Sequence, residues 1–230
     1  MARPRIVEQI PDIQEAIKLS AWRQIAELGA PALSLRAVAR DLGITLPAIY
    51  IYFQDRDALL TALLFDTYLS FSDFQLSASD LFPEPGMVLE RFRAIGIAYR
   101  EWAMANPQRF MLIFGAPIPG FSPPMEQIRP VMLRSLSALV GVIGQLHVAG
   151  RLNVDFLPLL DSDAIDSFFF GPVCLTSEDE IIYSLAMLIW SRVHGLVSLE
   201  ISRQVPSFGN VGDALFGFEV DTIIRQFVTL

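Results

Sequence analysis

The sequence predicts an all-α protein of about nine helices: an N-terminal three-helix helix-turn-helix domain, followed by a larger helical domain. Three observations carry this prediction. Apolar residues recur at helical spacing along most of the chain, period-two strand patterns are scarce, and Ser, Thr or Asp stands before several apolar stretches as a helix cap. The 230 residues suffice for a small domain plus a larger one, and 53% of them are hydrophobic.

The charge of the chain is unevenly distributed. The net charge of −8 by itself disfavours nucleic acid as a partner. Up to Asp57, however, the sequence has seven basic and seven acidic residues, and the remaining ten basic and eighteen acidic residues supply the whole negative balance. The first quarter is therefore neutral and can present a locally basic face.

Composition also indicates the cellular compartment. No uninterrupted apolar run reaches the roughly 18–20 residues of a membrane helix, and the N-terminal "MARPRIVEQIP" has no apolar stretch that would suit a secretory signal. The single cysteine, Cys174, excludes an internal disulfide and suits a reducing cytosol. We therefore expect a cytoplasmic protein without a membrane segment.

The first three expected helices are short. The first, in "PDIQEAIKLSAWRQIAELG", starts at the cap Asp12, stops before Gly29 and has an apolar face made of Ile13, Ile17, Ala21, Ile25 and Leu28. The second, in "SLRAVARDLG", is capped by Ser34, ends at Gly43 and carries an apolar stripe of Leu35, Val38, Ala39 and Leu42. The third, in "TLPAIYIYF", starts at Thr45 only two residues later.

The later helices are expected to be longer. The fourth, in "DRDALLTALLFDTYLSFSDF", is capped by Asp55, and the pattern breaks over residues 76–86. Further helices are expected in "MVLERFRAIGIAYREWAMAN", "PQRFMLIFG" and "MEQIRPVMLRSLSALVGVIGQLHVAG". The last two lie near residues 181–201, preceded by a capping box of Ser177 and Glu180, and near residues 212–230.

The second and third helices have the form of a helix-turn-helix. Two short helices joined by a three- to four-residue turn with glycine describe this motif, and its second helix enters the DNA major groove. The residues expected to face inward are Ile44, Ile49 and Phe53. The groove-facing tip then consists of Thr45, Leu46, Pro47 and Ala48. Tyr50 and Tyr52 each join an apolar ring to a hydroxyl, which suits hydrogen bonding to phosphate oxygens.

Spacing alone leaves the function of this helix pair open. Short helix pairs are common in small helical domains, and this segment has no net positive charge. A helical protein-interaction scaffold without a DNA role is the alternative to DNA binding.

Residues 12–60 resemble the DNA-binding domain of the tetracycline-repressor (TetR) family of bacterial transcription regulators. The resemblance is carried by "AWRQIAELGAPALSLRAVARDLGITLPAIYIYFQDRDALL". Later, "LAMLIWSRVHGLVSLE" resembles the Trp…His-Gly stretch of one C-terminal subtype of the family, at Trp190, His194 and Gly195. The resemblance implies a DNA-binding domain over residues 1–58 and an effector-binding and dimerisation domain over residues 59–230.

The resemblance also implies further DNA contacts. Ser34 and Arg36 are expected at DNA from the start of the second helix. Arg56 is expected at a phosphate from the start of the fourth helix, where relatives usually carry lysine. Ile51 stands where many relatives have a polar residue. An arm at residues 2–5, "ARPR", that reaches a minor groove and a disordered tail are both open.

Members of this family are dimers that bind both halves of a palindrome, so the resemblance implies a homodimer on a double-stranded DNA operator. The helices near residues 181–201 and 212–230 are expected to form the interface. They carry more large apolar residues than one strip against the chain's own core can cover: Leu185, Leu188, Ile189, Leu196, Leu199, Phe216, Phe218, Ile223, Ile224 and Phe227. A thick monomeric core is the alternative.

A small-molecule cavity in the second domain is a further implication of the resemblance. Its middle helices are rich in aromatic residues and methionine, which line apolar pockets and also fill ordinary cores. The expected ligand-binding residues are Phe92, Tyr99, Trp102, Phe110, Phe114 and Arg134, although Arg134 also suits a paired surface arginine. The effector is expected to be small, mostly apolar or aromatic, and to release a repressor from its operator.

The residues available disfavour an enzyme. His147, His194 and the single cysteine do not stand at metal-ligand spacing, and the sequence has no nucleophile–base–orienter set and no Gly-rich phosphate loop. The stretch "DSDAID" lacks the glycine and distal glutamate of a calcium loop and is expected to be solvated. We therefore expect no catalytic residue, no metal and no cofactor.

Overall fold

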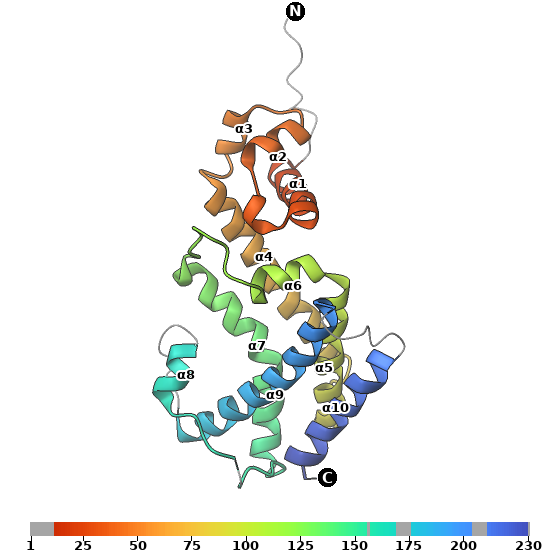
Figure 1. The fold of residues 1–230 in the computed structure, drawn as a ribbon. Coiled ribbons are helices and arrows are strands. Elements are labelled where there is room, and N and C mark those ends of the chain that lie inside the picture. Colours follow the sequence, from red (N-terminus) through yellow and green to blue (C-terminus); the bar gives the residue numbers. More distant parts are fainter. Residues whose placement is uncertain (1–11, 156, 169–175, 204–210, 230) are drawn as a thin grey trace, which may run out of the picture. The chain divides into compact units, whose positions relative to one another are not determined.

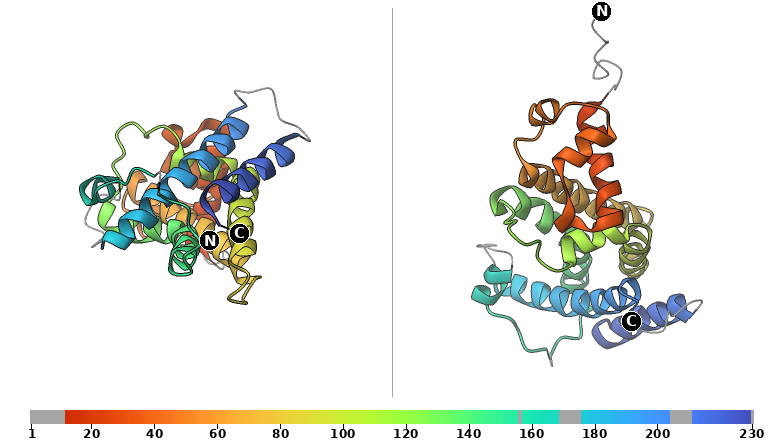
Figure 2. Two further views of the ribbon diagram at one scale, coloured as in Figure 1. Left: turned by 90° about the horizontal axis from the view of Figure 1, so that it is seen from below. Right: turned by 45° about the horizontal axis from the view of Figure 1, so that its top comes forward.

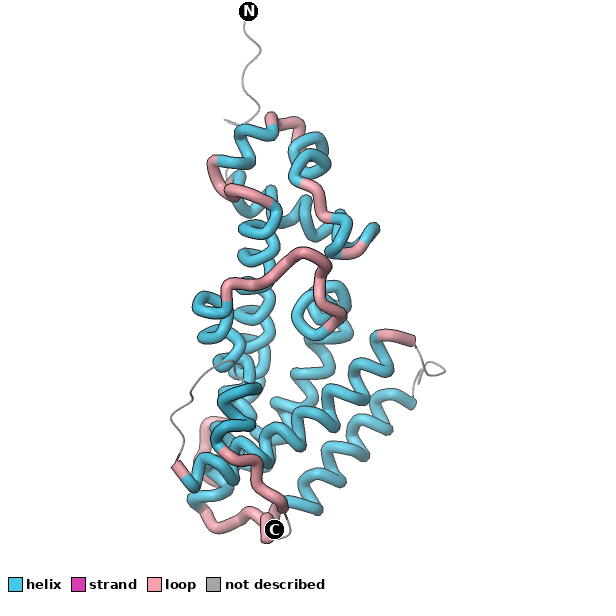
Figure 3. Tube along the Cα trace, turned by 60° about the vertical axis from the view of Figure 1, so that its left-hand side comes forward, coloured by secondary structure: helices cyan, strands magenta, loops and turns pink. Residues whose placement is uncertain are grey.

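The computed structural model describes residues 12–155, 157–168, 176–203 and 211–229. Within these ranges the chain forms ten α-helices and one short 3-10 helix, and no strand (Figures 1 and 3). The expected all-α class is therefore confirmed. Residues 2–5, for which an arm and a disordered tail were both open, and Cys174 lie outside the described residues.

The chain divides into two compact units. The N-terminal unit comprises residues 1–67 and 108–128, and the C-terminal unit comprises residues 68–107 and 129–230. Helix α4 (Arg56–Asp80) begins in the first unit and ends in the second. The expected domain division at residue 58 stays a prediction.

Short helices make up the N-terminal unit: α1 (Ile13–Leu28), η2 (Ala30–Ala32), α2 (Leu35–Asp41), α3 (Leu46–Tyr50), the first part of α4, and nearly all of α6 (Pro107–Phe114). The Asp12 carboxylate caps α1 by accepting a hydrogen bond from the backbone N–H of Glu15 at 3.0 Å. The helix stops at Gly29, whose φ of 80° lies in the left-handed region that glycine adopts without strain.

The core of this unit confirms most of the expected apolar stripes. Its buried side chains include Ile13, Ile17, Ala21, Ile25, Leu35, Val38, Ala39, Leu59, Leu60 and Leu63. The inclusion of Leu28 was wrong, because its side chain is 65% exposed. Leu28 shares the angular position of the stripe but lies in the last turn of α1, where the described residues do not cover it.

The C-terminal unit contains the long helices and one short one: the rest of α4, α5 (Val88–Ala105), nearly all of α7 (Met125–Val148), the short α8 (Ser162–Phe168), α9 (Ser177–Ile201) and α10 (Val211–Phe227). α9 and α10 lie side by side and antiparallel, and both pack on α5 (Figures 1 and 2). The guanidinium of Arg100 joins the three helices by contacting Glu200 on α9 and Asp213 on α10, each at 2.6 Å. Arg192 links α9 to Glu219 of α10 in the same way, at 2.6 Å.

One expectation about a helix start in this unit was wrong. α9 is capped by Thr176 and Asp179, not by Ser177 and Glu180: Asp179 accepts from the Thr176 N–H at 2.8 Å, and the Thr176 hydroxyl accepts from the Asp179 N–H at 3.3 Å. Both pairs have capping-box spacing, so sequence alone does not choose between them. The "DSDAID" stretch is largely exposed, as expected, and forms the start of α8, whose first turn is capped by the Asp161 carboxylate on the Ala164 N–H at 2.8 Å.

Two helices of the C-terminal unit, α7 and α9, are strongly apolar on average, although no uninterrupted apolar run in them reaches the length of a membrane helix. Met125–Val148 and Glu178–Ile201 are long and apolar enough, by length and composition alone, to cross a membrane, with mean hydropathies of 1.5 and 1.4. Within the most apolar 18-residue stretch of each helix, only 28% of α7 and 33% of α9 are buried within the described chain. Most residues of these stretches therefore keep contact with solvent in a single chain.

Candidate nucleic-acid interface

A four-residue turn joins α2 to α3. Gly43 occupies it with a φ of 66°, a conformation that a side chain would strain. The N–H of Ile44 bonds to the carbonyl of Ala39 at 3.0 Å, and the Ile44 side chain is buried. This turn fixes the direction in which α3 leaves the core.

One face of α3 anchors it and the opposite face is exposed. Ile49 is fully buried, and Ile44 and Phe53 are buried on either side of it, as expected. Leu46 and Ala48 pack partly against the core. The exposed positions are Thr45, Pro47, Tyr50, Ile51 and Tyr52. The expected tip of the helix thus presents two exposed residues, Thr45 and Pro47, and two half-buried ones.

The polar side chains at the starts of α2 and α3 make no capping hydrogen bonds. Ser34 occupies the N-cap position of α2 and Thr45 that of α3, but neither side chain bonds to the backbone of its helix. Tyr50 is 48% exposed and Tyr52 is 40% exposed. Their hydroxyls are therefore accessible to a partner outside the chain.

The four basic residues of α1 and α2 fall into two groups. Lys18 forms an ion pair with Asp66 at 2.6 Å, and Arg23 forms one with Asp41 at 2.5 Å. Hydrogen bonds from Ser20 and from Arg23 hold the pKa of Asp41 below its usual value. These two cations are already compensated by acidic neighbours.

Arg36 and Arg40 form the second group. Both are exposed, and within the described residues neither takes part in an ion pair. They stand four positions apart on α2, and so share one face of that helix. The sequence did not single out Arg40 as a candidate for DNA contact. Its position one turn after Arg36 is the signal that would have added it to the site.

Arg56, expected at a phosphate, has several contacts inside the chain. Its Nε donates to the carbonyl of Leu33 at 3.2 Å, and its Nη2 donates to the carbonyls of Ala30 and Pro31 at 3.2 and 3.1 Å. Asp57 lies 3.6 Å from its Nη1. The guanidinium therefore holds the segment before α2 against the start of α4.

The six expected ligand-binding residues belong to different units. Phe110 and Phe114 are in the N-terminal unit, where their ring centroids are 5.0 Å apart. Phe92, Tyr99 and Trp102 are in the C-terminal unit and are buried in its core. The rings of Tyr99 and Trp102 pack around Phe71 with centroids 5.0 and 4.8 Å from it.

A polar chain crosses this core between α5 and α9. The Tyr99 hydroxyl lies 2.8 Å from Nδ1 of His194, whose Nε2 lies 3.1 Å from the Ser198 hydroxyl. The His194 ring also stacks on Trp190 at 4.8 Å. Burial lowers the pKa of His194 and raises that of Tyr99. The neutral forms of both side chains are favoured in the folded protein.

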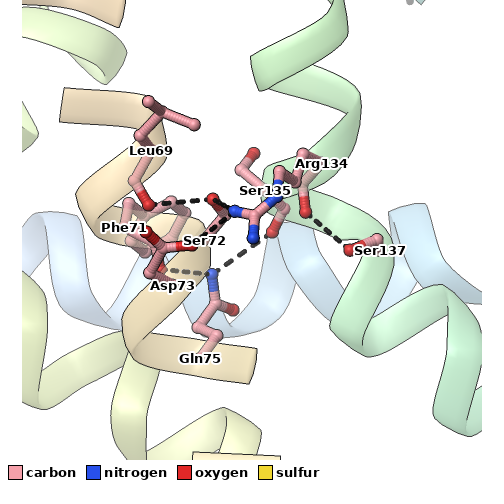
Figure 4. Close-up of polar contacts among 8 residues, drawn as sticks. All are labelled: Leu69, Phe71, Ser72, Asp73, Gln75, Arg134, Ser135 and Ser137. Carbon is pink, nitrogen blue, oxygen red and sulfur yellow. Dashed lines mark hydrogen bonds and ion pairs between the residues drawn. The ribbon is translucent and has the colours of Figure 1, made fainter. Parts of the chain in front are cut away.

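Arg134, expected to orient a ligand, is paired with α4. It donates to the Ser72 hydroxyl at 2.9 Å and forms an ion pair with Asp73 (Figure 4). Beside it, the buried side chain of Gln75 donates to the backbone carbonyl of Ser135 at 3.2 Å. In the described structure Arg134 thus fastens α7 to α4.

Grooves open on the surface of the part of the C-terminal unit that the structure describes. A groove of 550 Å³ lies between α4 and α5, and one of 1060 Å³ lies between the α4–α5 connection and α7. None of the six expected ligand-binding residues lines either groove.

A short exposed helix, anchored by Ile49 and flanked by accessible tyrosines and arginines, is the arrangement of a helix-turn-helix DNA-binding protein. Comparison with known proteins gives the family. Residues 19–63 match the profile described as bacterial regulatory proteins, tetR family, and residues 92–223 match the tetracyclin repressor-like C-terminal domain. The chain belongs to the TetR family of DNA-binding transcriptional regulators, as the sequence implied.

Individual relatives agree with this assignment. The chain is 35% identical over 191 residues to the HTH-type transcriptional regulators Rv1816 of Mycobacterium tuberculosis and Mb1846 of Mycobacterium bovis, covering 79% of this chain and 77% of each relative. The solved structure of SCO4313, described as a regulatory protein, has a TM-score of 0.72 at 30% identity and covers 98% of this chain and 100% of that one. A protein from Rhodococcus sp. RHA1 has the same TM-score at 22% identity, covers 96% of this chain and 97% of that one, and supports the fold alone.

Proposed function

We propose that two copies of this chain bind a palindromic DNA operator and repress the adjacent gene. The observation that supports this proposal is that α3 has one buried face and one exposed face: Ile49 is fully buried, while Thr45 and Pro47 are exposed at the start of the helix. In this proposal Thr45, Leu46, Pro47 and Ala48 meet base edges in the major groove. Phosphates are bound by Tyr50, Tyr52, Ser34, Arg36, Arg40 and Arg56.

The proposed homodimer uses the outer faces of α9 and α10. Of the five residues of α10 expected at the interface, four are buried by the chain itself, so the argument from surplus apolar residues was too broad there. Phe218 is the exception at 66% exposure, and Leu199 on α9 is 40% exposed. A side chain added at Gly195 or Gly217 would meet nothing within 4 Å, which leaves room for close approach of a second copy.

The effector in this proposal is a small, mostly apolar or aromatic molecule that binds the C-terminal unit. By binding the two conformations of the dimer unequally, it lowers the affinity for DNA. The aromatic core around Phe92, Tyr99 and Trp102 supports such a site, because small-molecule sites are lined mainly by hydrophobic and aromatic side chains. The protein acts in the cytoplasm, without catalysis or a cofactor, and the ligand contacts of Phe110, Phe114 and Arg134 belong to the same proposal.

The experiment is selection of bound fragments from a random DNA pool by the purified protein. We expect a palindrome whose half-sites are centred roughly 34–36 Å apart or at a related spacing. Affinity for the selected fragment should fall steeply with added salt, because phosphate contacts release counterions. An unenriched pool and a salt-independent affinity would instead support a protein-interaction scaffold. Enriched fragments without two-fold symmetry would contradict the dimer.

A further inference from the structure

The groove between α4 and α5 has an apolar floor built from residues that are exposed in the described chain. Phe74 is 43% exposed, Leu81 75% and Ile97 46%, and all three line the groove. The gaps between them are lined by small residues, namely Ala78, Ala94 and Ala98. Single exposed apolar side chains need no explanation, but three that line one hollow mark a binding surface.

The charged residues of the same groove are not balanced. Glu90, Arg93 and Glu101 also line it. Arg93, its sole basic residue, forms an ion pair with Asp221 on α10. Glu90 and Glu101 are exposed, and within the described residues neither forms an ion pair or a side-chain hydrogen bond. The groove therefore presents two uncompensated carboxylates.

The spacing of the two carboxylates places them at opposite ends of the floor. Glu90, Ala94, Ile97 and Glu101 follow one another at helical spacing along a single face of α5. Eleven residues of α-helix separate the carboxylates by roughly 16 Å along the axis. The volume of 550 Å³ is that of a site for one small organic molecule.

We propose that this groove binds a small organic cation with an apolar, preferably aromatic, body. The body packs on Phe74, Leu81 and Ile97, and the positive charge is held by Glu90 or Glu101. An anion of the same shape would face two carboxylates, while Arg93, the one basic residue among the described residues that line the groove, is occupied by Asp221. This site goes beyond the proposed operator binding, shares no residue with the expected effector site and is tested without DNA.

The test is a calorimetric titration of the full-length protein with tetraphenylphosphonium, with tetraphenylborate as an anion of matched size and shape. We expect one saturable site per chain for the cation, and binding of the anion at least about tenfold weaker. At least one of Glu90→Gln and Glu101→Gln should weaken cation binding about threefold to tenfold. Glu178→Gln, an exposed glutamate on α9 outside the groove, should leave it unchanged.

A blocking variant separates this groove from other apolar surfaces. Ser77 is exposed at the rim, so Ser77→Trp should fill the groove and abolish binding without disturbing the core. Ala94→Leu serves the same purpose with a smaller side chain, and thermal melts confirm that each variant folds. Equal affinity for the cation and the anion, or unchanged affinity in both glutamine variants, would overturn the proposal. An altered sedimentation coefficient of Ser77→Trp together with unchanged cation binding would also overturn it, because the groove would then be an interface with a second copy of the chain.

Discussion

The side chain of Arg56 donates a hydrogen bond from Nε to the carbonyl oxygen of Leu33 at 3.2 Å, just ahead of α2. Two further carbonyls, of Ala30 and Pro31, accept from the same guanidinium. The first residue of α4 therefore positions the segment that leads into the helix-turn-helix. A residue that resemblance assigns to phosphate contact also has a structural task.

Replacing Arg56 should separate these two tasks. Arg56→Ala removes three hydrogen bonds from a charged donor and should lower the free energy of unfolding by about 1–3 kcal/mol, measured by urea denaturation. Arg56→Lys keeps the charge but lacks the fork that reaches several carbonyls. It should be destabilised nearly as much while keeping the salt dependence of DNA binding. Stability equal to that of the unaltered protein in both variants would contradict the structural task.

Changes at the tip of α3 should alter which sequence is preferred. Thr45→Val and Pro47→Ala should each shift the preference at one base-pair position per half-site by about 1–3 kcal/mol. Tyr50→Phe removes one hydroxyl and should weaken binding to every sequence alike, by about 0.5–1.5 kcal/mol per contact. Fluorescence anisotropy on operators with single base changes distinguishes the two patterns. A uniform loss in all three variants would show that the tip does not read bases.

The unpaired arginines of α2 should set the salt dependence. Arg36→Gln or Arg40→Gln removes one phosphate contact per chain, which should reduce the slope of log affinity against log salt by about 1 per contact, hence by about 2 per dimer. Arg23→Gln changes the net charge equally, but its guanidinium already contacts Asp41, so the slope should change less. An equal salt dependence of DNA affinity in all three variants would show that α2 does not contact DNA phosphates.

Exposed Phe218 should hold two chains together. Phe218→Glu places a charge on the outer face of α10 and should weaken dimerisation at least about tenfold, measured by sedimentation equilibrium. Val148→Glu, at an 88% exposed position of α7, is the matched control and should leave the dimer intact. Affinity for a two-half-site operator should fall with Phe218→Glu, whereas an unchanged dimer would place the interface elsewhere.

Stability should fall on mild acidification through His194. Burial lowers its pKa in the folded state, so the unfolded chain binds more protons once the pH drops below the unfolded value of about 6.5. The free energy of unfolding should therefore decrease from pH 7.5 to pH 5.5, and the loss should continue down to the folded pKa. His194→Gln should remove most of that slope in urea denaturation. A slope that persists in His194→Gln would assign it to other groups.

Local sequence patterns determined much of the structure of this protein. The cap at Asp12, the stop at Gly29, the turn at Gly43 and the burial of Ile49 follow from spacing and backbone preference, which act within a few residues. The helix-turn-helix could be predicted for that reason. The same pattern places Thr45 and Pro47 on the exposed side of α3, away from its buried apolar face.

Only the tertiary structure decided how residues distant in the sequence share their partners. Arg134 had the chemistry to hold a ligand, yet it is paired with Asp73, which stands 61 positions earlier. Arg93 is occupied by Asp221, which leaves Glu90 and Glu101 uncompensated in a groove that no sequence pattern indicates. Helical periodicity specifies which face of a helix is apolar. Which element covers that face, and which charge neutralises which, depends on packing between segments that spacing along the chain does not encode.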